Sequence, residues 1–347
     1  MKFLHIAFLF FYILAFVSCK NEYVPRNFNS VKIEEISMHN TSIRAIHALP
    51  DSTLYYADSN GNIGLLLATN EQILHEKIVY DTIIPHFRSI ASNGNEIYAL
   101  SIGNPALLYQ ISEGEINLVY KEEDPKVFYD AMDFFDDRHG IAMGDPTDSC
   151  LSILLTNDGG QTWNKLECIA LPIIQEGEAA FAASNSNIAI IGTNAWVVTG
   201  GKRARVFYTP DMGASWDVYN TPITEGGQMT GIFSIDFFDE KNGIIFGGDW
   251  NNKTNNIANK AITDDGGKTW KLVADGKDPG YKSCVQYVPD TQGKEVFAVG
   301  TNGISYSNDQ GETWRKVSDD AYYTIRFVNK NFAWLAGEEK IGKLILN

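Results

Sequence analysis

The stretch that decides the fold is TNDGGQTW, residues 156–163, because three close copies of it follow in the chain. They are TPDMGASW from Thr209, TDDGGKTW from Thr263 and SNDQGETW from Ser307, and the four aspartates are spaced by 53, 54 and 44 residues. Such repetition predicts a repeated structural unit, because catalysis rarely needs four equivalent centres. The aspartates and tryptophans of the copies are Asp158, Trp163, Asp211, Trp216, Asp265, Trp270, Asp309 and Trp314.

A common strand pattern surrounds the copies. The stretch YDAMDFFDDRHGIAMGD, residues 129–145, precedes the first copy, and IFSIDFFDEKNGIIFGGD, residues 232–249, precedes the third. Each predicts an alternating strand, a polar turn and a second apolar strand; a third strand then enters the copy and a fourth follows its tryptophan. Four short antiparallel strands in a repeat of about 40 to 50 residues are typical of one blade of a β-propeller.

The same pattern predicts the number of blades. Two units without the motif precede the four that carry it, and the C-terminal unit has only three strands. We place the units at residues 42–80, 87–120, 129–167, 178–219, 232–273, 283–317 and 324–347. The stretch VKIEEISMH, residues 31–39, can supply the missing strand. We therefore predict an all-β, seven-bladed β-propeller over residues 31–347, closed by pairing the N-terminal strand with the C-terminal blade, which hides the sheet edges.

The four copies resemble the Asp box, or BNR repeat, of sialidases and related propellers. The resemblance implies a turn between the third and fourth strands of a blade, far from any active centre. Within it the aspartate can accept backbone N–H bonds, the glycine supplies positive φ and the tryptophan packs between blades. The four aspartates are therefore expected to be structural.

The blade count makes the chain most similar to the photosystem II stability/assembly factor-like proteins, which bind other proteins. The sialidase superfamily is a more distant resemblance, because sialidases have six blades. Sialidases also carry an Arg-Ile-Pro motif before the first box, whereas here Arg88 lies in FRSI. Sialidase activity is therefore disfavoured.

The N-terminal residues predict export. MKFLHIAFLFFYILAFVSC has one lysine and then an apolar run of about 15 residues, which is short for a bilayer span and typical of a signal peptide. Its ending resembles a bacterial lipobox. We predict a lipoprotein signal peptide at residues 1–18, a lipid on Cys19, a polar tether at residues 19–30 and an outer-membrane location in the cell envelope. The alternative is a soluble exported protein cleaved near Ser18.

The composition limits the classes of partner. The formal net charge is −15, whereas a duplex-binding protein needs a basic surface, so nucleic acid is not expected as a partner. No spacing of cysteine and histidine resembles a zinc site, so no metal is expected. We see no phosphate-binding loop or dinucleotide fingerprint and expect a monomer without a cofactor.

The cysteines of the exported chain include a candidate disulfide. Cys150 and Cys168 flank the first motif symmetrically, so a hairpin that pairs Leu155 with Trp163 would place them opposite each other. Export would permit the bond. Two buried free thiols are the alternative, and Cys284, in an apolar strand, is expected in the core.

Charged residues recur where the predicted inner strands begin, and these strands line the central channel of a propeller. Such charges are costly to bury unless they are paired or contact a ligand. The candidate ligand-binding residues are Arg44, Arg88, Asp130, Glu178, Lys282 and Arg326. Asp145 and Glu176 lie in glycine-containing loops that we expect at the same channel mouth.

Three functions remain open on this pattern. The arginines could bind an anionic group of a protein or glycan, or the charges could form a structural ring that orders water. Asp130 and Glu178 could also be the acid and base of a sialidase-like glycoside hydrolase. We favour a lipid-anchored envelope scaffold that binds or assembles a protein or glycan without catalysis, with the hydrolase as the alternative.

Overall fold

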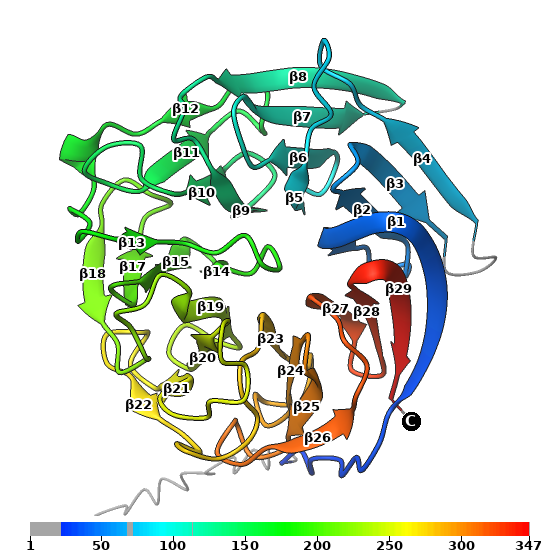
Figure 1. Cartoon of the computed structure of the whole chain (residues 1–347), viewed down its shortest axis with the longest axis vertical. Coiled ribbons are helices and arrows are strands. Elements are labelled where there is room, and N and C mark those ends of the chain that lie inside the picture. The colour runs from blue at the N-terminus through cyan, green and yellow to red at the C-terminus, as the bar shows by residue number, and fades with distance from the viewer. Residues whose placement is uncertain (1–21, 68–71, 113, 347) are drawn as a thin grey trace, which may run out of the picture.

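The chain folds almost entirely into antiparallel β-sheet. The computed structural model describes residues 22–67, 72–112 and 114–346, and over these it contains 29 strands and one short 3-10 helix. Figure 1 shows the sheets arranged in a ring around a common centre. Within the described ranges no helix is long and apolar enough to cross a membrane. The predicted signal peptide, residues 1–18, and Cys19 lie outside these ranges.

Four of the sheets contain four antiparallel strands each. Two of them consist of β5 (Phe87–Ser92), β6 (Ile97–Ser101), β7 (Ala106–Ser112) and β8 (Glu115–Glu122), and of β9 (Tyr129–Phe134), β10 (Gly140–Gly144), β11 (Ser152–Thr156) and β12 (Asn164–Lys165). The other two consist of β14 (Ile188–Ile191), β15 (Asn194–Val198), β17 (Arg205–Thr209) and β18 (Asp217–Asn220), and of β23 (Cys284–Tyr287), β24 (Val296–Gly300), β25 (Gly303–Ser307) and β26 (Arg315–Ser318). In each sheet the first strand lies toward the centre of the ring and the last strand at its rim (Figure 1).

The two remaining sheets join more than one group of strands. A six-stranded sheet contains β13 (Glu178–Ala179), β16 (Gly200–Gly201), β19 (Thr230–Phe237), β20 (Gly243–Asp249), β21 (Lys260–Thr263) and β22 (Lys271–Leu272). A seven-stranded sheet contains β27 (Thr324–Asn329), β28 (Phe332–Ala336), β29 (Glu338–Ile345), β1 (Lys32–Ala48), β2 (Leu54–Asp58), β3 (Asn62–Leu66) and β4 (Ile73–Lys77). The 3-10 helix η1 (Cys168–Ala170) follows β12.

The long strand β1 pairs both with the last strand, β29, and with the next strand along the chain, β2. Its N-terminal part pairs with β29, with Lys32 opposite Ile345 and Ser37 opposite Lys340, and its C-terminal part pairs with β2. This is the pairing that the sequence predicts for VKIEEISMH. It covers an edge of β29 that would otherwise expose unpaired N–H and C=O groups.

The hydrophobic core lies between neighbouring sheets. One cluster joins Leu100 of β6 to Met132 of β9, and another joins Phe297 of β24 to Leu335 of β28. The middle strands β10 and β24 are buried along their whole length, so their sequences are nearly continuous apolar runs. Burial of these faces is the main driving force that holds adjacent sheets together.

The motif turns share one hydrogen-bond pattern. In the first turn the Asp158 carboxylate accepts bonds from the Thr156 hydroxyl at 2.8 Å, the Thr162 backbone N–H at 3.0 Å and the Thr162 hydroxyl at 2.6 Å. Trp163 Nε1 donates to the carbonyl of Gly160 at 3.1 Å, and Gly160 has a φ of 93°. The same carboxylate bonds recur at Asp211, Asp265 and Asp309. The carboxylates are thus satisfied inside their own turns.

Each motif turn also packs against the preceding sheet. A Cβ atom at Gly160 would lie 2.5 Å from the ring of Tyr98 on β6, and one at Gly267 would lie 2.9 Å from Trp196 on β15. The ring of Trp163 meets Tyr98 at 6.3 Å between centroids. The turns therefore connect neighbouring sheets near the rim, which is the structural role expected for them.

The described part of the predicted tether is bound to the domain. Arg26 forms an ion pair of 2.7 Å with Glu295, whose side chain has no exposed surface, and the hydroxyl of Tyr23 donates to the same carboxylate at 2.7 Å. The ring of Phe28 packs edge-on against Tyr306, with 5.1 Å between centroids. Residues 22–31, termed the N-terminal strap, are therefore held against the sheet of β23–β26 and do not extend from the domain as a polar tether. The buried carboxylate of Glu295 needs a cation, and the Arg26 guanidinium of the strap supplies it.

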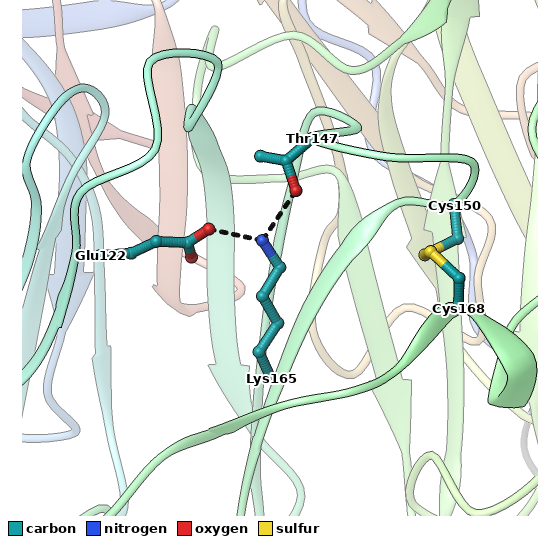
Figure 2. Close-up of a disulfide and its surroundings, with 5 residues drawn as sticks. All are labelled: Glu122, Thr147, Cys150, Lys165 and Cys168. Atoms are coloured by element: carbon teal, nitrogen blue, oxygen red, sulfur yellow. Dashed lines mark hydrogen bonds and ion pairs between the residues drawn. A yellow bond between two sulfur atoms is a disulfide. The ribbon is translucent and has the colours of Figure 1, made fainter.

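A disulfide joins Cys150 and Cys168, with a Sγ–Sγ distance of 1.99 Å (Figure 2). This is the predicted pair, but the hairpin register used to predict it is wrong by one residue. Leu155 pairs with Asn164 rather than with Trp163. The cysteines still meet, with Cα atoms 5.4 Å apart, because both lie beyond the paired residues of β11 and β12.

Candidate functional site

The chain between β13 and β14 reaches into the centre of the ring (Figure 1). Residues 180–187, AFAASNSN, are termed the central segment; their mostly small side chains suit a crowded position between inner strands. The sequence predicts an inner strand that begins at Glu178, and this is wrong. The inner strand of that sheet is β14, which begins at Ile188, whereas β13 pairs with β16.

Three of the predicted ligand-binding arginines hold the central segment. Arg88 Nη1 donates to the carbonyl of Ala182 at 2.7 Å, and Arg44 Nη1 donates to the carbonyl of Ala183 at 2.9 Å. Arg326 Nη2 donates to the next two carbonyls, at 3.0 and 2.6 Å. The arginines therefore converge, as the sequence predicts, but on carbonyl groups of the chain itself, which need partners when buried.

Side chains of the central segment bind the surrounding strands. The Ser184 hydroxyl donates to the carbonyl of Ser283 at 2.7 Å. The Asn185 amide donates to the carbonyl of Ile90 at 2.8 Å, and its carbonyl accepts the backbone N–H of Met132 at 3.0 Å. The segment is thus bonded to several inner strands at once and is an integral part of the fold.

A pocket of about 340 Å³ adjoins this segment, and we term it the central pocket. Its walls are mainly apolar: the rings of Phe181 and Phe233 stack with centroids 3.9 Å apart, and Tyr281 meets Phe233 edge-on at 4.7 Å. The lining residues are Arg44, Arg88, Phe128, Asp145, Ala179, Ala180, Phe181, Ala182, Ala183, Gln228, Met229, Phe233, Trp250 and Tyr281. Size and lining suit a ligand group with an apolar body.

Two polar atoms of the pocket residues lack protein partners. The Tyr281 hydroxyl and Arg44 Nε are buried, and neither forms a hydrogen bond with any residue that the structure describes. The guanidinium of Arg44 instead lies over the ring of Tyr323, 3.6 Å from its centroid. An unsatisfied buried donor is unfavourable by about 1–3 kcal/mol, so these two donors favour a ligand that supplies acceptors.

Two aspartates adjoin the arginines of the pocket. Asp145 lines it and accepts the backbone N–H of Ala180 at 2.8 Å, and burial raises the pKa of Asp145 to about 6. Asp130 is fully buried; the backbone N–H groups of Ala182 and Asp145 lie near it, but neither of its oxygens accepts a well-aligned bond from the described residues. Burial, and then the charge of Asp145, raise the pKa of Asp130 well above its usual range, while Arg88 opposes the rise.

The raised pKa of Asp145 predicts a stability change with pH. The folded state holds a proton on this carboxyl up to about pH 6, whereas the unfolded chain loses it near the ordinary value of 3.8. Its contribution is therefore most favourable below about pH 4 and declines as the pH rises to about 6. Between pH 4 and pH 7 this carboxyl should lower the unfolding free energy by about 2–3 kcal/mol, and we expect Asp145→Asn to remove that loss, as measured by urea titration. An unchanged pH dependence would contradict the raised pKa.

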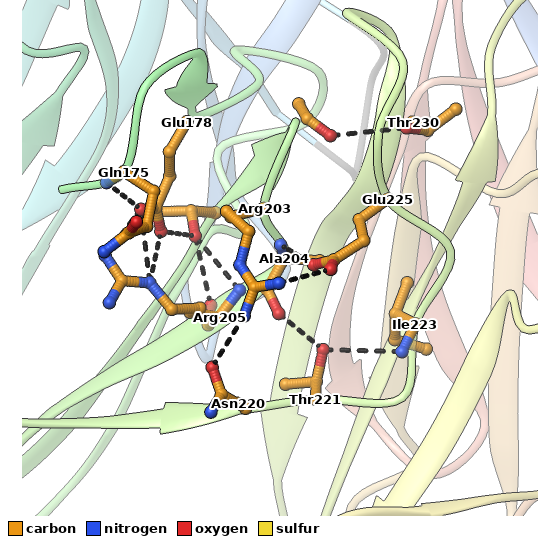
Figure 3. Close-up of polar contacts among 12 residues, drawn as sticks. Gln175, Glu178, Arg203, Ala204, Arg205, Asn220, Thr221, Ile223, Glu225 and Thr230 are labelled. Atoms are coloured by element: carbon orange, nitrogen blue, oxygen red, sulfur yellow. Dashed lines mark hydrogen bonds and ion pairs between the residues drawn. The ribbon is translucent and has the colours of Figure 1, made fainter.

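Glu178 belongs to a separate, fully paired cluster (Figure 3). Its carboxylate forms an ion pair of 2.5 Å with Arg205, and the two side chains are 0% and 8% exposed. It also accepts bonds from the Thr199 hydroxyl at 2.7 Å and the Gln175 backbone N–H at 2.8 Å. Neither Glu178 nor Asp130 lines the central pocket, and both are buried, so the two carboxyls do not flank that pocket as an acid and base pair.

The remaining predicted residues also lie outside the central pocket. Lys282 lines a different pocket, and Arg326 is directed at the central segment. Of the six candidates, only Arg44 and Arg88 line the central pocket. The aromatic walls were missed, although Trp250 directly after an inner hairpin was an available signal. Among the described residues no three Asp, Glu, His or Cys side chains are grouped as metal ligands.

Sequence comparison identifies the motif turns. The BNR/Asp-box repeat matches residues 261–272 and 305–316, which contain the turns of Asp265 and Asp309. The chain carries BNR/Asp-box repeats. The Asp boxes connect the third and fourth strands of their groups, and their residues do not line the central pocket. No curated protein matches the chain in sequence.

Solved structures similar to the chain show that its fold is that of a β-propeller. YCF48 bound to a D1 peptide is 15% identical, with a TM-score of 0.65 over 92% of this chain and 97% of that one. YCF48 from Cyanidioschyzon merolae is 13% identical, with a TM-score of 0.65 over 90% and 98%. A virginiamycin B lyase from Staphylococcus aureus with quinupristin is 13% identical, with a TM-score of 0.67 over 92% and 100%. The two YCF48 structures agree with the resemblance to photosystem II assembly factors, and all three likenesses concern the fold.

Proposed function

We propose that the chain is a seven-bladed propeller that binds a protein partner without catalysis. The blade count is supported by seven consecutive groups of four strands, the last of which uses the N-terminal part of β1 as its fourth strand. Pairing of β1 with β29 closes the ring in this interpretation. The first and last strands of the folded domain, β1 and β29, thus lie side by side in the seven-stranded sheet.

The central pocket carries the binding proposal. It combines aromatic walls with two buried donors, the Tyr281 hydroxyl and Arg44 Nε, that lack acceptors among the described residues. An apolar side chain of a partner, flanked by a backbone or side-chain carbonyl, fits both features. The fold is shared with YCF48, whose structure holds a D1 peptide, and a protein segment is therefore favoured over a glycan as the ligand.

The hydrolase alternative receives less support. Glycoside hydrolysis needs two carboxyl groups that flank one substrate site. Here Glu178 is committed to Arg205, and Asp130 is covered, whereas the carboxyl that faces the central pocket is that of Asp145. A single accessible carboxyl beside two arginines suits the binding of a polar group better than acid and base catalysis.

The place of action that we propose is the bacterial cell envelope. The apolar leader at residues 1–18 and the FVSC ending support export and a lipid on Cys19. The disulfide between Cys150 and Cys168 is compatible with an oxidising compartment. The outer membrane is the location that we propose for the anchor.

Site-specific crosslinking in cells tests the binding proposal. A photoreactive residue at Gln228, which is exposed and lines the central pocket, should give one discrete adduct with an envelope protein. Trp250→Ala should abolish the adduct, and Tyr281→Phe should weaken partner binding by about tenfold through loss of one hydrogen bond. The same probe at Gln161, exposed in an Asp box, is the matched control. Equal adducts at both positions, or adducts unaffected by Trp250→Ala, would contradict the proposal.

A further inference from the structure

A second pocket, of about 320 Å³, gathers positive charge in a chain whose formal net charge is −15. Four cationic side chains line it, those of Lys253, Lys282, Arg315 and Lys316, with one carboxylate, that of Asp278. We term it the cationic pocket. It shares no lining residue with the central pocket.

Lys282 is the most deeply placed of these cations. It is only 1% exposed, and its Nζ donates to the side-chain carbonyl of Asn302 at 3.0 Å and the backbone carbonyl of Gly303 at 2.6 Å. Within the described ranges no carboxylate lies within 4.0 Å of this nitrogen. Burial, and then the positive charge of Lys316, lower the pKa of Lys282 to about 7. A nearby anion would relieve both penalties.

The other cations are only weakly neutralised. Lys316 pairs with Asp319, whose side chain is 93% exposed, and such surface pairs contribute little. Lys253 lies over the ring of Trp250, 3.9 Å from its centroid, rather than beside a carboxylate. Arg315 donates to the amide carbonyl of Asn27, a neutral acceptor in the N-terminal strap. The cluster therefore keeps most of its positive charge.

An unpaired hydroxyl provides independent evidence for a ligand. Ser305 lines the same pocket and is 1% exposed, and its Oγ forms no hydrogen bond with any described residue. A buried hydroxyl without a partner is unfavourable, so it is normally matched by a ligand or water. Here it can donate to an oxyanion that also contacts the lysines.

We propose that the cationic pocket binds a phosphate ester. A phosphate group presents several charged oxygens and can accept bonds from Lys282, Lys316 and Ser305 together. The pocket is larger than one phosphate ion, and the ring of Trp314 in its wall can contact the attached organic group. The ester can come from a soluble metabolite or from a phospholipid headgroup, and both share this chemistry.

Calorimetric titration of the full chain tests the site. Glycerol phosphate should bind saturably and more tightly than acetate, whose single carboxylate satisfies fewer donors. Lys316→Ala should weaken binding by about tenfold, and Ser305→Ala should weaken it by a similar factor. Lys271→Ala is the matched control, because it removes one charge from a side chain that is 78% exposed on β22 outside this pocket. It should change the affinity by less than about twofold.

Two results would overturn the proposal: no saturable binding of glycerol phosphate, or equal losses in Lys316→Ala and Lys271→Ala. Flotation with vesicles separates the two sources of phosphate and uses a Cys19→Ser chain, which cannot carry the proposed lipid. Phosphatidylglycerol carries a net negative charge, whereas choline neutralises the phosphate of phosphatidylcholine. Binding to phosphatidylglycerol vesicles only, lost in Lys316→Ala but kept in Lys271→Ala, assigns an anionic headgroup. Binding of glycerol phosphate alone assigns a soluble ester. Since the two pockets share no residue, Tyr281→Phe should leave phosphate binding unchanged.

Discussion

Deletion of residues 322–347 is expected to unfold the whole domain rather than to shorten it. The deletion removes β27, β28 and β29, so the N-terminal part of β1 loses its pairing partner. It also exposes one face of the cluster that contains Phe297. A second cluster, which joins Tyr56 of β2 to Trp334 of β28, packs against the opposite side of the deleted strands and is exposed as well. If the ring is closed as proposed, the deletion uncovers both of the blades that neighbour the deleted strands.

Urea unfolding followed by tryptophan fluorescence provides the measurement. The deleted chain should show no cooperative transition and a strongly reduced near-ultraviolet circular dichroism signal. The chain that starts at residue 22, which keeps the N-terminal strap and all described strands, is the control and should unfold cooperatively. A deleted chain with native cooperativity would overturn the seven-blade interpretation.

Arg205→Met is expected to lower the unfolding free energy by about 3–5 kcal/mol, because it leaves the Glu178 carboxylate buried without its cation. The side chain of Glu178 has no exposed surface, and Arg205 supplies its shortest contact, at 2.5 Å, and a further one at 2.9 Å. The double substitution Glu178→Met with Arg205→Met should recover much of the loss, because it removes the second charge as well.

The neighbouring pair of Arg203 and Glu225 supplies a matched control (Figure 3). Its ion pair is 2.7 Å long, against 2.5 Å for the buried pair, but its side chains are 41% and 31% exposed. Arg203→Ala should therefore change the unfolding free energy by less than about 1 kcal/mol. Equal effects of Arg203→Ala and Arg205→Met in urea titrations would show that the buried pair has no special structural role.

Much of the fold could be predicted because it is repeated. The motif turns carry their own hydrogen bonds, so the same eight positions form the same turn wherever they occur, as at Asp158 and Asp309. The apolar middle strands and the pairing of VKIEEISMH with the last strand follow from the need to bury faces and cover edges. These features depend on local chemistry and on the number of strands in each repeat.

The candidate site was harder to predict because its key element breaks the repeat. The central segment AFAASNSN stands where the pattern predicts an inner strand, so Glu178 was placed at the channel instead of beside Arg205. Its run of small residues was the available signal, since large side chains would not fit among the inner strands. Arg44 and Arg88 were found from their position, but their carbonyl partners come from a segment distant in sequence.

The N-terminal strap limits how the domain can move relative to a bilayer. If Cys19 carries a lipid as proposed, only four residue steps separate it from Tyr23, whose hydroxyl is bound to Glu295. Four steps of extended chain span at most about 14 Å. The domain would then have little rotational freedom about its attachment, and the part of the β23–β26 sheet that contacts the N-terminal strap would stay next to the headgroups. A partner at the central pocket would accordingly be presented at a fixed height and angle above the membrane surface.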